Sequence, residues 1–244
     1  MEPSTNNTKP NDGTDPFTTV VVLSGGMDST TLMAHYAALG CDLVAVTVDY
    51  GQRHRKEIDA ARWIADHYGA THHVVDLSGL GAVLGGSALT DDSVAVPDGH
   101  YAEQSMRATV VPNRNAVLAN VAVSVGVAHR AGVVALGMHA GDHFIYPDCR
   151  PEFHEALRQL VKVANEGFPT PSVEAPFITW SKADIARHGS RLGAPLADSW
   201  SCYKGGDRHC GTCGTCYERR EAFQVAGVVD PTDYLDDVTR FAAP

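Results

Sequence analysis

The chain has 244 residues, of which 44% are hydrophobic, and its formal net charge at pH 7 is -10. This length and apolar content suffice for a globular fold with a sizeable core. No stretch approaches the about 20 apolar residues of a membrane span, and residues 1–16 lack the basic start and apolar centre of a signal peptide. We therefore expect a cytoplasmic protein without membrane contact. The acidic balance also disfavours docking of the whole molecule on nucleic acid.

The first predicted structural element is a buried strand that ends in a glycine-containing loop. Residues 1–16, rich in Asn, Thr, Pro and Asp, precede it as a predicted disordered leader. The apolar run 20–23 is followed by S-G-G-M-D-S at 24–29 and then by a helical pattern. Two glycines let the backbone approach a ligand, and the free N–H groups of a helix start favour an anion. The loop has no Walker A lysine and is not G-x-G-x-x-G, and an ordinary Gly-Gly turn is the alternative.

Strands and helices are predicted to alternate after this loop. Alternation at this spacing is typical of a doubly wound parallel sheet, in which ligands bind beyond the carboxyl ends of the strands. We assign residues 17–199 to this α/β nucleotide-binding domain and residues 200–244 to a separate tail. The predicted strands are 20–23, 43–48, 73–77 and 133–137, the predicted helices are 29–39, 56–68, 116–131, 152–165 and 182–192, and residues 79–103 are predicted to be a loop.

Three polar clusters fall at predicted strand ends or helix starts. D-Y-G-Q-R-H occupies 49–54, V-P-N-R-N occupies 111–115, and Y-P-D-C-R occupies 146–150. Each alone is compatible with a capped helix start and a surface ion pair. Three such clusters facing one anion site indicate a ligand pocket. His139 and His143, just before the third cluster, are candidate proton carriers, with polar surface as the alternative.

Four of the six cysteines are concentrated in the tail, among several glycines. Zinc binds thiolates at about 2.3 Å in a tetrahedron, and two-residue spacings let a turn wrap around the metal. Disulfides are the rival interpretation, which the absence of a secretory signal disfavours. Four sulfur ligands leave no open position, so one zinc is expected to fold the tail rather than catalyse. Cys41 is expected in the core, whereas Cys149 lies within a polar cluster. The predicted metal ligands are Cys202, Cys210, Cys213 and Cys216.

These motifs together resemble those of the 7-cyano-7-deazaguanine (preQ0) synthase family, within the PP-loop ATP pyrophosphatases. The resemblance spans residues 20–217 and includes S-G-G-M-D-S-T-T at 24–31, the three polar clusters, the helix start near Lys182, and S-C-Y-K-G with the later cysteines. It implies conversion of 7-carboxy-7-deazaguanine and ammonia into the nitrile through an adenylated carboxylate, an amide and a second activation by ATP. It also implies a role in queuosine biosynthesis, magnesium, zinc and a homodimer.

The implied chemistry suggests roles for individual residues. Replacing one carboxylate oxygen with an AMP leaving group removes the charge that repels ammonia, and the cradle amides can hold the departing pyrophosphate, with Asp28 a candidate for Mg²⁺. Asp142 or Asp148 could accept the paired N–H donors of a guanine-like ring, with Tyr146 against its face. The predicted ATP-binding residues are Leu23, Ser24, Gly25, Gly26, Met27, Asp28, Ser29, Thr30 and Arg53, the predicted substrate-binding residues are Asn113, Arg114, Asn115, Asp142, Tyr146, Asp148 and Arg150, and the predicted catalytic residues are Asp28, Arg114, Asp142 and Lys182.

Two segments depart from the family pattern. Many relatives read V-P-G-R-N where Asn113 stands here, and the segment before Y-P-D-C-R commonly resembles E-T-D-F-S-G where this chain has A-G-D-H-F-I at 140–145. Only Asp142 of that segment is kept. We expect the nitrile as the product, and an amide synthase that stops at 7-amido-7-deazaguanine is the alternative.

Two further functional classes are compatible with the motifs. Some PP-loop proteins thiolate tRNA, and a zinc tail can act as an RNA-binding knuckle. The tail mixes acidic and basic residues without a basic run, which weighs against this class. A protein that binds nucleotide or deazapurine without turnover is the third class.

Overall fold

The computed structural model describes residues 17–53, 55–100 and 106–236. The predicted leader, residue 54 of D-Y-G-Q-R-H, part of the predicted 79–103 loop and the end of the predicted tail lie outside these ranges. The strands are β1 (Thr18–Val22), β2 (Asp42–Asp49), β3 (Thr71–Asp76), β4 (Val133–Ala135) and β5 (Ser172–Glu174), and the helices are α1 (Met27–Ala38), α2 (Lys56–His67), α3 (Ser78–Gly81), α5 (Arg114–Ala128), α6 (Pro151–Ala164), α7 (Lys182–Leu192) and α8 (Gly214–Ala226).

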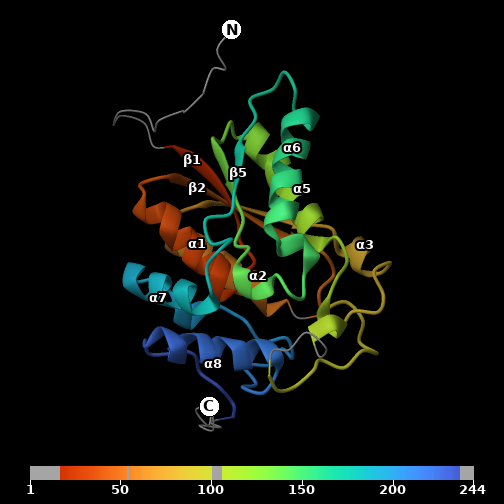
Figure 1. Cartoon of the computed structure of the whole chain (residues 1–244), viewed down its shortest axis with the longest axis vertical. Coiled ribbons are helices and arrows are strands. Elements are labelled where there is room, and N and C mark those ends of the chain that lie inside the picture. The colour runs from red at the N-terminus through yellow and green to blue at the C-terminus, as the bar shows by residue number, and fades with distance from the viewer. Residues whose placement is uncertain (1–16, 54, 101–105, 237–244) are drawn as a thin grey trace.

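The strands form a single parallel sheet in the order β3-β2-β1-β4-β5, which confirms the predicted fold class. Consecutive strand residues point to opposite faces, and both faces are covered by helices (Figure 1). Val20 and Val46 pack with α5 and α6 on one face. Val21 and Ala45 pack with α1, α2 and α7 on the other. The apolar, β-branched composition of β1 and β2 follows from this burial on both sides.

The loop between β1 and α1, residues 24–29, is hereafter the cradle loop. Gly25 has a φ of +87°, a conformation that residues with a side chain rarely adopt. A Cβ at this position would also lie 2.1 Å from the carbonyl oxygen of Glu57 in α2. The glycine is therefore required twice, by the backbone conformation and by the close approach of α2.

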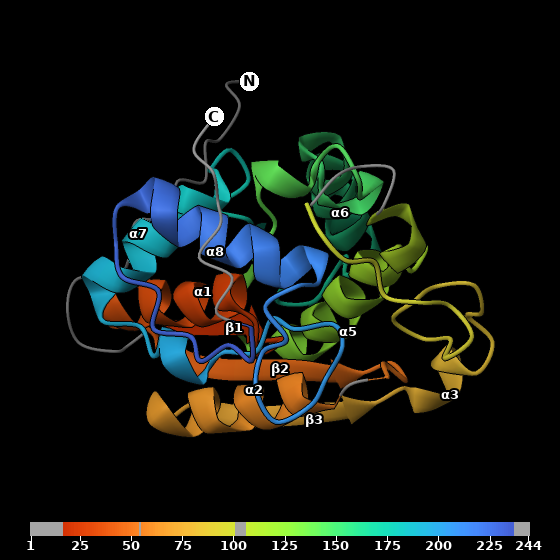
Figure 2. The same cartoon turned by 90° about the horizontal axis from the view of Figure 1, so that it is seen from below.

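The tail packs directly onto the α/β unit. Helix α8 lies beside α7 and over the start of α1 (Figures 1 and 2), where Phe223 and Met27 belong to one apolar cluster. Arg219 of α8 is 1% exposed and donates hydrogen bonds to the Ser199 hydroxyl and the Leu196 carbonyl. These contacts join the tail to residues before the predicted domain boundary at 199/200. None of the described helices has the length and apolar content to cross a membrane.

Three elements were missed by the sequence analysis. The short helix α3 lies at 78–81, where a loop was predicted from residue 79. The fifth strand, β5, lies at 172–174, just before the apolar 175–178 segment, and has only three residues, which is too short for a periodic signal. Helix α8 begins at Gly214, inside the cysteine cluster, so its first turn coincides with residues that were interpreted only as part of a metal-binding turn. The predicted 182–192 helix is confirmed, with Ser181 and Asp184 forming its capping box.

Candidate functional site

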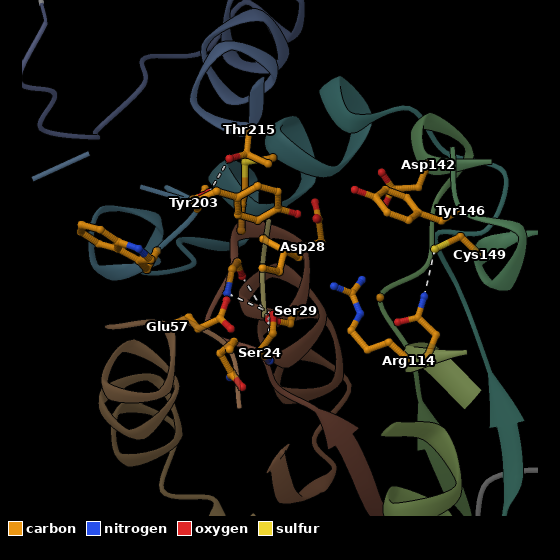
Figure 3. Close-up of a pocket in the computed structure, with 18 of the residues that line it drawn as sticks. Ser24, Asp28, Ser29, Glu57, Arg114, Asp142, Tyr146, Cys149, Tyr203 and Thr215 are labelled. Atoms are coloured by element: carbon orange, nitrogen blue, oxygen red, sulfur yellow. Dashed lines mark hydrogen bonds between the residues drawn. The ribbon is translucent and has the colours of Figure 1, made fainter. Parts of the chain in front are cut away.

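A cavity of about 230 Å³ opens at the carboxyl ends of the strands, where the cradle loop, α5, α7 and the tail meet (Figure 3). This is the place where doubly wound sheets bind ligands. The lining includes Ser24, Gly26, Met27, Asp28 and Ser29 of the cradle loop, Tyr50, Gln52, Arg53 and Glu57 after β2, Arg114 and Asn115 of α5, Asp142, Tyr146 and Cys149 after β4, Lys182 of α7, and Trp200, Ser201, Cys202, Tyr203, Thr215, Glu218 and Arg219 of the tail.

The cradle loop is held in shape by its own hydroxyl groups. The Ser29 hydroxyl lies 3.1 Å from the Ser24 hydroxyl and accepts a hydrogen bond from the Ser24 N–H at 3.2 Å. The Thr30 hydroxyl donates to the Gly26 carbonyl at 2.8 Å. Gly26 precedes α1 as its N-cap residue without a capping side chain. The first N–H groups of α1 are therefore directed toward the cavity, where an anion would complete their hydrogen bonds.

One group of charged residues, hereafter the Lys182 wall, consists of Asp28, Asp142, Lys182 and Glu218, which line the cavity, together with the fully buried His139. The Lys182 ammonium donates to Asp28 Oδ2 at 2.8 Å and lies 3.2 Å from Glu218 Oε2. The His139 Nε2 lies 3.4 Å from Asp142 Oδ2 and 3.7 Å from Asp28 Oδ2. Three carboxylates from three segments thus converge on one ammonium and one imidazole.

Charge pairing dominates the ionisation of this wall. Burial alone would raise the pKa of Asp28, but the charges of Lys182 and His139 outweigh it and hold the pKa well below its usual range. Burial would lower the pKa of Lys182, but Asp28 and Glu218 raise it. Burial raises the pKa of Glu218, and Lys182 only partly opposes this. Asp28 is therefore ionised and Lys182 is charged at neutral pH.

His139 is fully buried, so it is not the polar surface residue that was the alternative. Its Nδ1 accepts a hydrogen bond from the Gly141 N–H at 3.1 Å, which leaves the proton on Nε2, facing the carboxylates. Burial would lower the pKa of His139, but Asp142 and Asp28 raise it. A Cβ at Gly141 would lie 3.0 Å from the imidazole, so the departure from the family pattern at 141 makes room for this ring.

A second group of lining residues, hereafter the Arg114 wall, consists of Tyr50, Glu57, Arg114 and Tyr146. The Arg114 guanidinium lies 6.0 Å from the Tyr50 ring centroid and 5.9 Å from that of Tyr146. Figure 3 shows it pointing into the space between Asp28 and Tyr146. The Tyr146 hydroxyl is 2.8 Å from the Thr109 hydroxyl, which fixes the ring. A cation over aromatic faces suits a planar anionic ligand.

The predicted substrate-binding residues have different surroundings. Arg114, Asn115, Asp142 and Tyr146 line the cavity. Asp148 Oδ2 accepts the Asn115 N–H at 2.9 Å, at the start of α5. Arg150 is exposed and donates from Nε to the His143 carbonyl at 2.7 Å. Asp148 and Arg150 are outside the cavity lining, and their binding roles stay predictions.

The departure at Asn113 has a conformational explanation. Asn113 precedes α5 with a φ of 62°, in the left-handed region. Glycine is favoured there, and asparagine is among the residues that tolerate it. The substitution for the glycine of V-P-G-R-N therefore keeps the backbone that places Arg114 in the first turn of α5.

The predicted ATP-binding residues are divided between the cavity and its support. Ser24, Gly26, Met27, Asp28, Ser29 and Arg53 line the cavity. The Arg53 guanidinium is already engaged, since it donates to the Ala88 and Val94 carbonyls at 3.2 and 3.0 Å. Leu23, Gly25 and Thr30 support the loop from behind, as in the 2.6 Å hydrogen bond from the Thr47 hydroxyl to the Leu23 carbonyl.

The four tail cysteines converge as predicted. Their sulfur atoms all lie within 4.8 Å of one another, and no disulfide joins any of the six cysteines. The N–H groups of Thr212 and Cys213 donate to Cys210 Sγ at 3.4 and 3.3 Å, which suits a thiolate ligand. The donor set can hold a metal ion. Cys149 is separate, and burial raises the pKa of its thiol far above the usual range, which argues against a nucleophile.

Sequence reasoning missed several cavity residues. Glu57 follows D-Y-G-Q-R-H by three positions and is the first acidic residue of α2, so its place near a strand end could have indicated it. Trp200, Tyr203 and Glu218 belong to the tail, which was interpreted only as a metal-binding segment. No local pattern indicates that the tail folds back over the strand ends.

The chain is similar to proteins of one family along most of its length. The family described as queuosine biosynthesis protein QueC matches residues 18–227. The 7-cyano-7-deazaguanine synthase of Rhizobium rhizogenes is 56% identical over 219 residues, which are 89% of this chain and 92% of that protein. The synthase of the same name from Rhizobium johnstonii is 54% identical, with the same coverage of 89% and 92%. Among solved structures, NMN synthetase from Francisella tularensis aligns with a TM-score of 0.41 and 11% identity over 77% of this chain and 66% of that chain.

Proposed function

Because the chain belongs to the QueC family of queuosine biosynthesis proteins, we propose that it is an ATP-dependent ligase that makes 7-cyano-7-deazaguanine (preQ0) from 7-carboxy-7-deazaguanine and ammonia. It is a carbon-nitrogen ligase that converts ATP to AMP and pyrophosphate. Close relatives named for the nitrile product match over 92% of their length, which favours the nitrile over the amide and over tRNA modification.

The observation that carries this proposal is the position of the cradle loop. Its helix start lines the same cavity as Lys182 and Arg114. A site with backbone donors and flanking cations suits the pyrophosphate of ATP, and the absence of a Walker A lysine fits adenylation rather than transfer of the γ-phosphate. The remaining space lies against Tyr146 and Asp142, where the deazaguanine acid would bind.

The residues have distinct roles in the first half of the reaction. The substrate carboxylate attacks the α-phosphorus of ATP, and pyrophosphate leaves into the cradle loop. Lys182 and Arg114 balance the charge that develops on the phosphate oxygens. Asp142 accepts N–H donors of the base, and the Tyr146 ring packs against it. Ammonia then displaces AMP to give the amide.

The second half uses the same cavity. The amide oxygen attacks the α-phosphorus of a second ATP, and loss of AMP with the two remaining nitrogen protons gives the nitrile. Both activations therefore require the reacting oxygen to reach the same phosphorus, and misalignment by about 1 Å can cost about 10²-fold in rate. The loop 139–150, which carries Asp142 and Tyr146, is the segment that sets this alignment.

Magnesium fits the Asp28 carboxylate. Asp28 Oδ1 is buried and has no hydrogen-bond partner among the described residues, while Oδ2 is held by Lys182. An ionised oxygen without a donor at the cavity wall is suited to a hard cation or to its bound water. Bound there, Mg²⁺ would neutralise phosphate charge in both activations.

Zinc fits the tail cysteines, as one ion per chain. Four sulfur ligands complete a tetrahedron, so the metal would stabilise the tail and supply no open position for a reactant. We further propose a cytoplasmic homodimer that binds no nucleic acid. The net charge of -10 supports the last point, and size-exclusion chromatography with light scattering and a tRNA mobility shift at low salt test the two assignments.

Product analysis tests the proposed function. The protein is incubated with 7-carboxy-7-deazaguanine, ATP, Mg²⁺ and ammonium, and the products are identified by mass spectrometry. We expect preQ0, AMP and pyrophosphate. ADP and orthophosphate as primary products would exclude adenylation.

A second incubation separates the nitrile from the amide. Isolated 7-amido-7-deazaguanine and ATP are supplied without ammonium. Formation of preQ0 is expected. If the acid is amidated but the isolated amide gives no nitrile, the protein is an amide synthase.

A further inference from the structure

The addition of ammonia, which rests on the proposed function, requires a proton acceptor. The ammonia nitrogen forms a bond to the acyl carbon of the adenylate, and the carbon–oxygen bond breaks with its electron pair leaving on AMP. The nitrogen must lose one proton before the neutral amide results. Adenylation itself needs no such acceptor, because the attacking carboxylate already carries no proton. A proton acceptor is therefore needed when ammonia attacks the adenylate and is not needed when the carboxylate is adenylated.

Four carboxylates line the cavity, and three of them are already paired. Asp28 and Glu218 lie 2.8 and 3.2 Å from the Lys182 ammonium. Asp142 lies 3.4 Å from the His139 imidazole. A carboxylate held by a cation is a weaker base and is fixed in place by its partner. The fourth carboxylate, Glu57, is in no ion pair within the described residues.

Glu57 lies beside the cradle loop. It is in the first turn of α2, and its carbonyl occupies the space where a side chain at Gly25 would lie. Its carboxylate accepts a hydrogen bond from the Gln52 side chain. The side-chain oxygen of Gln52, Oε1, in turn accepts a hydrogen bond from the Tyr50 N–H at 2.9 Å. The side-chain NH₂ group of Gln52 is therefore oriented toward Glu57. Arg114 from α5, Asp49 and Tyr50 from the end of β2, and Gln52 are the charged and polar groups that face it.

We propose that Glu57 is the general base that takes the proton from the attacking nitrogen when ammonia displaces AMP. The Glu57 backbone lies against Gly25 of the cradle loop, and Glu57 lines the cavity in which the activated substrate and its phosphate would bind. The positive charge of Arg114 partly balances the negative charge of the Glu57 carboxylate, but the two groups do not form an ion pair. The proton then passes from Glu57 to solvent.

The ionisation of Glu57 supports this role. Burial raises its pKa, Arg114 and Gln52 oppose the rise, Asp49 adds to it, and the pKa reaches about 7. A base is most effective when its pKa is near the working pH. Asp28, with a pKa far below its usual range, is a poor proton acceptor by the same criterion.

Partial reactions test the proposal in the zinc-loaded, full-length protein. Exchange of labelled pyrophosphate into ATP, dependent on 7-carboxy-7-deazaguanine, reports adenylation alone, and amide formation reports the ammonia step. For Glu57→Gln, we expect exchange within about 3-fold of wild type and amide formation slower by at least about 10²-fold. Glu155→Gln, on the exposed side of α6, is the matched control and should retain both rates.

A pH profile provides the second measurement. With the concentration of free ammonia held constant, the wild-type rate of amide formation should fall below pH about 7, as Glu57 takes up a proton. Glu57→Asp should keep this acid limb at a lower rate, and Glu57→Gln should lack it. The Asp variant also keeps the test decisive if the Gln variant does not fold.

Three results would overturn the proposal. The first is amide formation by Glu57→Gln within about 3-fold of wild type. The second is equal loss of exchange and amide formation in a variant with normal thermal unfolding, which would assign Glu57 to ATP binding. The third is an acid limb that persists in Glu57→Gln. Absence of exchange in the wild-type protein is a different result, because it contradicts the proposed function itself.

Discussion

The two walls of the cavity hold charge in different ways. In the Lys182 wall, carboxylates meet an ammonium and an imidazole at distances of 2.8 to 3.7 Å. In the Arg114 wall, the guanidinium lies over two tyrosine rings, and the nearby Glu57 is in none of the ion pairs of the described residues. Paired charges are preorganised for a ligand that is already charged when it binds, such as the ATP phosphates. A cation and a carboxylate kept apart remain available for charge and protons that arise only during reaction.

Loss of the metal site should affect both stability and the cavity, because the tail supplies Glu218 to the Lys182 wall. Cys213 is both a predicted ligand and the N-cap of α8, which carries Glu218. In Cys213→Ser we expect loss of bound metal and a fall in unfolding free energy of at least about 3 kcal/mol, seen as a Tm lower by about 6 °C or more. Elemental analysis and calorimetry measure both. Cys41→Ser is the control, and full zinc content with normal stability in Cys213→Ser would contradict the assignment.

Lys182→Met should abolish most activity. The substitution removes a cation that lines the cavity and leaves Asp28 and Glu218 without their ion-pair partner. We expect kcat/KM to fall about 10³-fold, equivalent to about 4 kcal/mol, measured by pyrophosphate release. Lys162→Met, at an exposed position of α6, should have no effect. A loss smaller than tenfold would show that pairing in this wall is not used in the reaction.

Activity should depend on the planar shape of the Arg114 guanidinium as well as on its charge. Arg114→Lys keeps the charge but loses the planar group that lies over Tyr50 and Tyr146. We expect kcat about 10-fold lower for Arg114→Lys and about 10²-fold lower for Arg114→Met. Steady-state kinetics with the acid and with the isolated amide measure the effect in each half of the reaction. If Arg114→Lys and the wild type have equal rates, the Arg114 wall requires only a point charge, as the Lys182 wall does.

Tyr146→Phe should give the smallest effect. The ring stays against Arg114, and the 2.8 Å hydrogen bond with the buried Thr109 hydroxyl is lost. We expect a destabilisation of about 1 kcal/mol, with kcat changed less than about 3-fold. Denaturant unfolding and kinetics measure the two quantities. A large fall in kcat with unchanged stability would place the hydroxyl group in the reaction.

The local motifs could be interpreted from the sequence because each acts through neighbouring residues. The cradle loop needs only a strand, two glycines and a helix start. Three of the four cysteines, Cys210, Cys213 and Cys216, are spaced three residues apart, so local geometry already brings their sulfur atoms close together. The boundaries of α7 were predicted residue for residue, since its capping box and the glycine after it are local signals.

The contacts between distant segments could not be predicted in the same way. Lys182 and Asp28 are separated by 154 residues, and no periodicity relates them. His139 is fully buried, so it is an internal hydrogen-bonding group and not a polar surface residue. This burial depends on the packing of α7 and α8 over the 139–150 loop. The pairing of Asp148 with the α5 backbone and the position of Glu57 beside Gly25 likewise follow from packing.

The sequence by itself determined the class of fold and the family resemblance, and it predicted the anion site and the metal ligands, because glycine conformation, hydrophobic period and ligand spacing are properties of short segments. Only the tertiary structure decided how the tail closes the cavity and which carboxylates acquire a cation. Those outcomes depend on the distances between charges and on their removal from water, and both are set by the packing of elements far apart in the chain.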